Sequence, residues 1–261
     1  VGLLEKRGRR YLVFPEPSGS PIQVEPPKLS VKEGQAVTVE VLQFARGSTP
    51  ASGRVRAVLG DPRDPHVQVS MLLGSLSLPD EFPKEVLSEA NQYSEPTAAA
   101  LLQEDRKDLS SVLHMTIDGE DAKDFDDAVA AAASGDQIRI WVSIADVAYY
   151  VRPHTALDQQ ARLRGTSVYF PHLVLPMLPE HLSNNLCSLR PHVPRATLTA
   201  EFVVYPEGRI GQTNIYASFI CSAARLTCNE VEKQIGKAPS DKLTQTLHTL
   251  LEAARRIRQR R

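Results

Sequence analysis

Four of the five aspartates in the stretch 115–129, which reads MTIDGEDAKDFDDAV and is called the acidic stretch below, stand out as candidate metal ligands. They are Asp118, Asp124, Asp126 and Asp127. So many like charges are costly to hold together unless a cation shares the site. Ile117 and Phe125, residues of the type that packs into a core, lie among them. Carboxylates anchored beside apolar residues suit Mg²⁺ or Mn²⁺ in phosphoryl chemistry, so the stretch predicts a hard-metal site.

The spacing of these aspartates excludes the most common calcium loop. An EF-hand requires glycine at its sixth position and a bidentate acid at its twelfth, and counting from Asp118 these positions hold Lys123 and Val129. In an extended segment Asp124 and Asp126 share a face, whereas the residue after them needs a bend to join them. The alternative to a metal site is a solvated acidic loop, which the apolar neighbours disfavour.

The residues after the acidic stretch predict a mixed α/β domain. A hairpin is expected around the turn at 134–136, with a strongly apolar second strand. A helix is expected over 153–164, with Gly165 as its stop. Further elements are expected in this order: an extended segment at 166–179, a hairpin turning at Glu207 and Gly208, a strand at 214–226 and a helix at 240–261.

The first 83 residues predict a small β-barrel. Short strand-like runs alternate with segments rich in turn formers, and the runs are RYLVF, IQVE, AVTVEVLQF, GRVRAVLG and VQVSMLL. About five short strands suit a barrel of the OB or cold-shock type, which commonly binds single-stranded nucleic acid. Arg9 and Arg10, beside Tyr11 and Phe14, offer phosphate-seeking charge next to rings for stacking. The alternative for these charges is a plain solvated face.

The expected organisation is an OB-type domain at 1–83, a helical connector at 84–112 and a catalytic-type domain from 113 to 261. The connector places prolines before runs of Ala, Leu, Glu and Lys, which predicts two short helices. The fold class is therefore α+β and mostly β. A hydrophobic fraction of 42% supplies enough apolar residues for the cores of a barrel and an α/β domain.

Composition bounds the setting of the protein. The three cysteines are an odd number without a CxxC pair, and the first residues form no basic-then-apolar leader, so a reduced, cytoplasmic location is expected. No stretch is apolar enough to cross a membrane. A net charge of -1 neither indicates nor excludes nucleic acid, because an acidic metal site and a basic groove cancel in the sum.

Several long motifs resemble the catalytic domain of the ribonuclease II and ribonuclease R family. In order along residues 113–227 they are TIDGEDAKDFDDAV, IWVSIADVAYYVRP, RGTSVYFPHLVLPMLPEHLSNNLCSL and ARLT. The acidic stretch is more similar to ribonuclease R than to ribonuclease II. The resemblance implies a Mg²⁺-dependent, hydrolytic and processive 3′-to-5′ exoribonuclease that degrades single-stranded RNA to nucleoside 5′-monophosphates. It also implies that residues 1–83 are a cold-shock domain that binds RNA.

The resemblance carries roles to individual residues. It places the family's metal-site aspartates on Asp118, Asp124, Asp126 and Asp127. Among these we expect Asp118 and Asp127 to be direct ligands and Asp126 to be indispensable to the chemical step. Tyr169 matches the ring that stacks on 3′-terminal bases, where the alternative is a core tyrosine on a strand. Cys228 departs from the pattern, because the family has a tyrosine there.

Other residues have plainer expectations. Asp146 is expected to satisfy backbone or arginine groups, and Cys187 is expected to be a core residue without a redox role. The motifs span less than half of the family's catalytic domain, so the rest of that domain and an S1 domain are expected in a C-terminal half that completes the enzyme. The alternative is an RNA-binding fragment with an intact metal loop but little or no activity.

Overall fold

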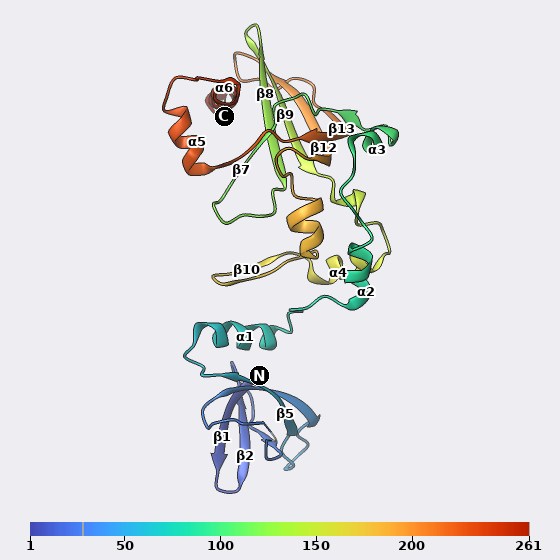
Figure 1. Cartoon of the computed structure of the whole chain (residues 1–261). Helices are drawn as coiled ribbons and strands as arrows, with labels where there is room; N and C mark the ends of the chain where they lie inside the picture. Colours follow the sequence, from blue (N-terminus) through green and yellow to red (C-terminus); the bar gives the residue numbers. More distant parts are fainter. Residues whose placement is uncertain (28, 261) are drawn as a thin grey trace. The chain divides into compact units, whose positions relative to one another are not determined.

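The computed structural model describes residues 1–27 and 29–260, and the chain divides into two compact units (Figure 1). The first unit comprises Val1–Phe82 together with Thr166–Leu175. The second comprises Pro83–Gly165 together with Pro176–Arg261. Each unit has its own core.

The first unit contains a closed five-stranded barrel with the strand order β1-β2-β3-β5-β4. Its strands are β1 (Gly2–Arg7), β2 (Arg10–Pro15), β3 (Ile22–Val24), β4 (Ala36–Gln43) and β5 (Ser52–Gly60). Closure comes from β4 pairing with β1, which removes the free edges of the sheet. The barrel is filled by Leu4, Val13, Val24, Val37 and Val55. This confirms the predicted OB-type barrel.

One strand of the predicted set is wrong. Residues 67–73 lie in helix α1 (Pro65–Leu76), and the remaining strand of the barrel is β1, which the prediction did not assign. The Asp64 carboxylate accepts a hydrogen bond from the backbone N–H of His66 at 2.9 Å, and proline occupies the first turn. A side-chain cap followed by proline starts a helix, and it outweighs the strand preference of the two valines that follow.

A small hairpin also belongs to the first unit. It consists of β10 (Val168–Phe170) and β11 (Leu173–Leu175), which pair antiparallel, as expected for an extended segment interrupted by proline. The ring of His172, in the turn, lies 3.9 Å between centroids from the ring of His66 in α1. The hairpin thus has a contact with the helix that follows the barrel.

The α-helices of the second unit follow the prediction with one exception, and the unit also has two short helical segments that were not predicted, Val147–Tyr149 and Leu182–Leu186. The connector forms α2 (Lys84–Ala90) and α3 (Ala98–Gln103), and α4 (Ala156–Arg164) ends at Gly165, whose φ of 73° glycine adopts without strain. The missed helix is α5 (Cys228–Ile235). Thr227 and Glu230 cap it reciprocally, a Thr-x-x-Glu signature that the sequence prediction overlooked. The predicted boundaries at 84 and 112 stay predictions.

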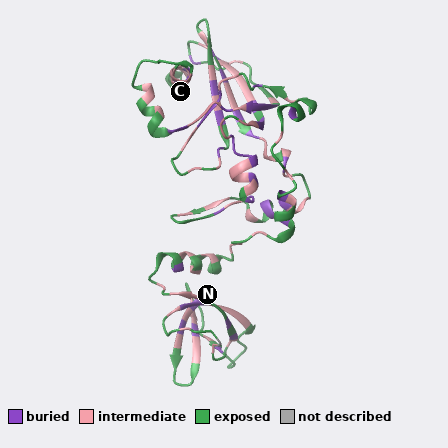
Figure 2. Ribbon diagram, viewed as in Figure 1, coloured by how far each residue is buried: buried purple, intermediate pink, exposed green. Residues whose placement is uncertain are grey.

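A seven-stranded mixed sheet forms the centre of the second unit, in the order β14-β7-β8-β9-β12-β13-β6. Its strands are β6 (Lys107–Asp108), β7 (Met115–Asp118), β8 (Asp127–Ser134), β9 (Gln137–Ala145), β12 (Pro194–Val204), β13 (Asn214–Cys221) and β14 (Ala224–Thr227). The β8–β9 pair confirms the predicted hairpin. Buried residues follow the central strands (Figure 2).

Helix α6 (Lys242–Arg260) covers one face of this sheet. Ala253 of the helix packs with Ile138, Ile140 and Val204 of the sheet, as the apolar stripe of the sequence predicts. Within the described part of the chain, no helix has both the length and the apolar character needed to span a membrane.

Candidate active site

Two neighbouring strands bring the acidic residues to one end of the sheet. Asp118 is the last residue of β7 and Asp127 is the first residue of β8, and the two strands run antiparallel. Asp124 and Asp126 lie on the connection between them. We call residues 118–127 the acidic loop. Because the strand ends are adjacent, four carboxylates of one short segment share one region of the surface.

Burial and neighbouring negative charge raise the pKa of two carboxylates of the acidic loop. The pKa of Asp118 lies above its usual value, first because burial disfavours its charge and then because Asp127 and Asp124 add negative charge nearby. The pKa of Asp126 is raised by partial desolvation of its carboxyl group, then by the charges of Asp124, Asp127 and Asp118. A divalent cation would remove this electrostatic cost.

One oxygen of the acidic loop is unsatisfied. Within the described residues Asp118 Oδ2 is buried and has no hydrogen-bond partner, whereas buried polar atoms normally have one. Across residues 1–27 and 29–260, no three His, Cys, Asp or Glu side chains converge closely enough to hold a metal ion. The carboxylates therefore fit a hard cation by charge and oxygen chemistry, not by a closed coordination shell.

The backbone of the acidic loop is held from two sides. On one side, Nη2 of Arg225 in β14 donates to the carbonyls of Gly119 at 2.5 Å and Glu120 at 2.7 Å. The same guanidinium lies 5.6 Å from the centroid of the Phe125 ring. On the other side, the hydroxyl of Ser188 accepts from the Phe125 N–H at 3.0 Å. These contacts fix the conformation in which the aspartates are presented.

Sequence reasoning gave neither Arg225 nor Ser188 a role in holding this loop. A signal existed for Arg225, which stands in the ARLT motif on a strand that pairs parallel with β7, where it is opposite Thr116. No spacing in the sequence indicates that Ser188 meets a backbone group 63 positions earlier. That interaction depends on the tertiary fold.

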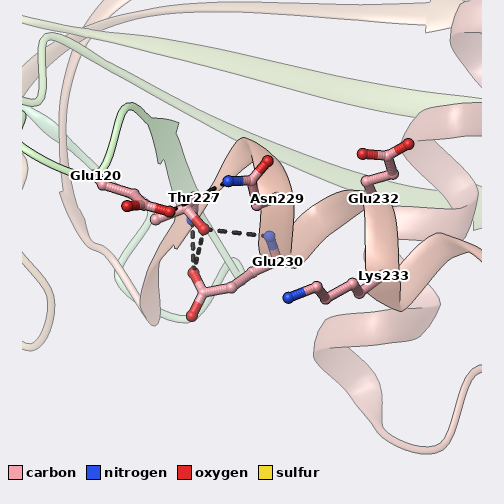
Figure 3. Close-up of a pocket in the computed structure, with 6 residues that line it drawn as sticks. All are labelled: Glu120, Thr227, Asn229, Glu230, Glu232 and Lys233. Atoms are coloured by element: carbon pink, nitrogen blue, oxygen red, sulfur yellow. Dashed lines mark hydrogen bonds between the residues drawn. The ribbon is translucent and has the colours of Figure 1, made fainter.

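A hollow of about 420 Å³ lies beside the acidic loop (Figure 3). Its lining consists of Glu120, Thr227, Asn229, Glu230, Glu232 and Lys233. Glu230 accepts from the N–H and the hydroxyl of Thr227, so this carboxylate serves as the cap of α5. The four aspartates are not among its described lining residues. The hollow is therefore a neighbour of the candidate site and not its centre.

The structure confirms that Asp146 pairs with an arginine and that Cys187 is a core residue. Asp146 Oδ2 pairs with Nη2 of Arg106 at 2.5 Å. Cys187 is buried, and burial raises the pKa of its thiol to about 12. A thiol that stays protonated is inert, so Cys187 packs as a core residue. Cys228, at the position of the family's tyrosine, is exposed at the start of α5.

Tyr169 lies on the surface of the first unit. It belongs to β10 opposite Val174 and is 64% exposed, so the alternative of a core tyrosine is wrong. The four aspartates belong to the second unit. The ring is thus exposed on a short hairpin.

The basic and aromatic residues predicted on the barrel do not all line one groove. Arg9, Arg10 and Tyr11 line a groove of about 320 Å³ together with Gln23 and Leu42 among other residues. Tyr11 also packs against the barrel core. Phe14 lies on the opposite face of the strand, because three positions separate it from Tyr11, and the guanidinium of Arg7 lies 5.0 Å from its ring centroid. The structure thus gathers three of the four predicted residues.

The chain combines a closed five-stranded barrel with an α/β domain that presents an acidic loop, and family models place these two parts in the class of RNB-type proteins with a cold-shock domain. The family model described as RNB domain matches residues 106–261, and the model described as Cold shock domain matches residues 18–83. The chain belongs to the ribonuclease II and ribonuclease R family, and it lies closer to ribonuclease R.

Curated relatives and a solved structure agree with this placement. Ribonuclease R of Acidithiobacillus ferrooxidans is 40% identical over 241 residues, and the match covers 89% of this chain and 55% of the relative. Ribonuclease R of Escherichia coli (strain K12) is 40% identical over 244 residues, covering 89% of this chain and 30% of the relative. The match therefore spans between 30% and 55% of the length of these two relatives.

The structural likeness extends over nearly the whole chain. The structure of Mycoplasma genitalium RNase R in complex with double-stranded RNA is 25% identical and has a TM-score of 0.88. The match covers 99% of this chain and 47% of that chain. The barrel and the sheet domain thus both have counterparts in a ribonuclease R.

Proposed function

We propose that the protein is a Mg²⁺-dependent exoribonuclease that hydrolyses single-stranded RNA processively from its 3′ end to nucleoside 5′-monophosphates. The observation that carries the proposal is the acidic loop, in which four carboxylates crowd together and Asp118 Oδ2 is buried with no partner in the described residues. The solved structure of Mycoplasma genitalium RNase R in complex with double-stranded RNA supports RNA as the ligand class.

Each aspartate has a proposed part. Asp118 and Asp127 hold the cation from the ends of β7 and β8, and Asp124 completes the negative site from the loop. Asp126 adds a further carboxylate to the cation site and is indispensable to the chemical step. Mg²⁺ supplies Lewis-acid polarisation of the phosphodiester and activation of water, and Mn²⁺ is the expected substitute. Crowded carboxylates with perturbed pKa values are typical of functional sites.

RNA reaches this site through sequence-independent contacts. The groove beside Arg9, Arg10 and Tyr11 offers positive charge and one ring to a single strand, and the exposed ring of Tyr169 offers a stacking surface. Base stacking on an aromatic ring contributes about 1–3 kcal/mol per base and tolerates any base. Such contacts suit an enzyme that must accept every nucleotide in turn.

The alternative function is an RNA-binding fragment with little or no turnover. It is favoured by the fact that the chain spans 30% of the Escherichia coli relative. We propose that a C-terminal part, with the rest of the RNB domain and an S1 domain, completes the enzyme. Ile144 pairs with Asp127 and with Leu198, and both apolar residues are nearly half exposed, which supports a partner surface beside the site.

The location we propose is the cytoplasm. Its support is the state of the three cysteines, since Cys187, Cys221 and Cys228 are all free thiols.

A digestion of uniformly labelled single-stranded RNA with Mg²⁺, in which both the remaining RNA and the released nucleotides are followed, tests the activity. The full-length protein is expected to shorten the RNA processively and release monophosphates, and EDTA or Asp126→Asn is expected to stop it. Asp121→Asn is the matched control, because it removes an exposed carboxylate from the same loop without touching the four. Release of diphosphates only when phosphate is added would contradict hydrolysis. Binding without degradation by this chain alone would support the fragment alternative for these residues.

A further inference from the structure

Arg195, at the start of β12, is a buried guanidinium that is only 1% exposed. It donates through Nε to the carbonyl of Ser188 at 2.9 Å and through Nη1 to the carbonyl of Pro194 at 3.0 Å. Nη2 donates to Glu95 Oε1 at 3.0 Å. A guanidinium does not lose its proton in proteins, so burying it is costly unless its donors are satisfied and its charge is balanced. The charge of Arg195 therefore needs a counterion, and its hydrogen bonds to backbone carbonyls indicate a structural role.

The counterion comes from the connector. Glu95 lies between α2 and α3, and the same Oε1 also receives a bond from Arg190 at 2.5 Å. The pKa of Glu95 is lowered, first by its hydrogen bond with Arg195 and further by the charges of both arginines. Glu95 is therefore ionised at neutral pH and balances the charge of Arg195.

The structural role lies at Ser188, which is fully buried. Its hydroxyl accepts from the Phe125 N–H at 3.0 Å and donates to the Lys123 carbonyl at 2.8 Å. The next residue, Leu189, donates its N–H to the Phe125 carbonyl at 2.9 Å. Three hydrogen bonds thus hold the backbone on both sides of Asp124 and immediately before Asp126.

We propose that Glu95, Arg195 and Ser188 form a positioning relay that holds Asp124 and Asp126 in the conformation that binds the cation. The inference rests on the proposed cation site. In this proposal, Glu95, Arg195 and Ser188 do not themselves contact the substrate or the metal. Arg195 fixes the backbone of Ser188, Ser188 fixes the backbone of the acidic loop, and the connector controls both through the charge of Glu95.

Ser143 provides the matched control. Like Ser188 it is fully buried in the second unit, and its hydroxyl bonds to His114 Nε2 at 3.0 Å and to the Thr199 hydroxyl at 2.7 Å. Neither of these described partners belongs to the acidic loop. Ser143→Ala therefore removes a hydroxyl of equal burial without removing a bond to the loop.

The test compares the wild-type protein with Ser188→Ala and Ser143→Ala by two measurements. Hydrogen exchange reports the amide of Phe125, and Mn²⁺ titration followed by electron paramagnetic resonance reports the cation site. Ser188→Ala is expected to exchange that amide roughly tenfold faster. It is also expected to bind Mn²⁺ roughly 10–100-fold more weakly, the range found when groups that orient metal ligands are removed. Ser143→Ala is expected to leave both readings at the wild-type level.

A second pair of variants tests the charge of the connector. Glu95→Gln removes the counterion of the buried Arg195 and is expected to weaken Mn²⁺ binding in the same direction as Ser188→Ala. Arg190→Gln removes only the more exposed partner of Glu95 and is expected to have no effect. Unchanged Mn²⁺ binding and unchanged exchange in Ser188→Ala would overturn the relay. Faster exchange in Ser188→Ala, with a wild-type protein that binds no Mn²⁺, would support the positioning of the loop and contradict the cation site.

Discussion

At the scale of single residues, His114 makes the stability of the second unit depend on pH. It is fully buried, with Nε2 on the Ser143 hydroxyl at 3.0 Å and Nδ1 on the Val112 carbonyl at 3.1 Å. Burial lowers the pKa of His114 from 6.5 to about 4. The folded protein thus keeps the ring neutral where the unfolded chain would charge it.

The stability of the second unit is therefore expected to fall as the pH drops from 6.5 to about 4. In this pH window His114 is protonated in the unfolded chain but stays neutral in the folded protein. The free energy of unfolding therefore decreases by about 1.36 kcal/mol per pH unit, roughly 3 kcal/mol in all. Urea unfolding followed by the fluorescence of Trp141, the single tryptophan, measures it. His114→Gln should flatten the profile, and equal slopes in both proteins would contradict the prediction.

At the scale of elements, α5 depends on its cap. Thr227 ends β14 opposite Asp118, and its hydroxyl accepts from the Glu230 N–H at 3.2 Å, so the cap joins the helix to the strand beside the acidic loop. Thr227→Ala is expected to lower the free energy of unfolding by about 1 kcal/mol, the usual cost of removing such a cap. Thr249→Ala, within α6, is the control and is expected to be neutral or stabilising. Trp141 fluorescence in urea compares them, and equal midpoints would contradict the role of the cap.

Local sequence signals predicted some of these elements and were overlooked in others. The β8–β9 hairpin was predictable because its turn and its apolar strand are local signals. Helices α1 and α5 both begin with a local cap, at Asp64 and Thr227, but neither was predicted. The apolar, β-branched run 67–73 favoured a strand in place of α1, and residues 228–235 were assigned no element. The caps carried more information than the propensities.

The candidate site divides in the same way. The four aspartates were found because they are close together in the sequence and belong to one loop. Ser188 and Arg195 were not, since their hydrogen bonds with Phe125 and Glu95 join residues 63 and 100 positions apart. Groups that hold a site through long-range backbone interactions leave no periodic pattern.

At the scale of the whole molecule, the net charge is only -1, although Arg9 and Arg10 line a basic groove on the barrel. If phosphates bind at Arg9 and Arg10, replacing both by glutamine should weaken binding of a single-stranded oligouridylate. The slope of log K against log salt should become shallower by about 0.7 for each phosphate that the variant no longer neutralises. Affinities measured between about 50 and 200 mM KCl test this.

The matched control for that experiment is Arg63→Gln. Arg63 also belongs to the first unit, but it is paired with Asp61 at 2.7 Å and lies outside the groove lining described for Arg9 and Arg10. Its replacement is expected to leave the salt slope unchanged. An unchanged slope in the Arg9 and Arg10 variant would instead make these charges a plain solvated face.

The central claim is that the acidic loop binds a divalent cation, and a calorimetric titration with Mn²⁺ in the absence of RNA tests it most directly. We predict that the wild-type protein binds Mn²⁺, that Asp118→Asn and Asp126→Asn weaken binding at least tenfold by removing carboxylates from the site, and that Asp121→Asn binds as the wild type does. Equal affinity in all four proteins, or no binding in any, would contradict the claim.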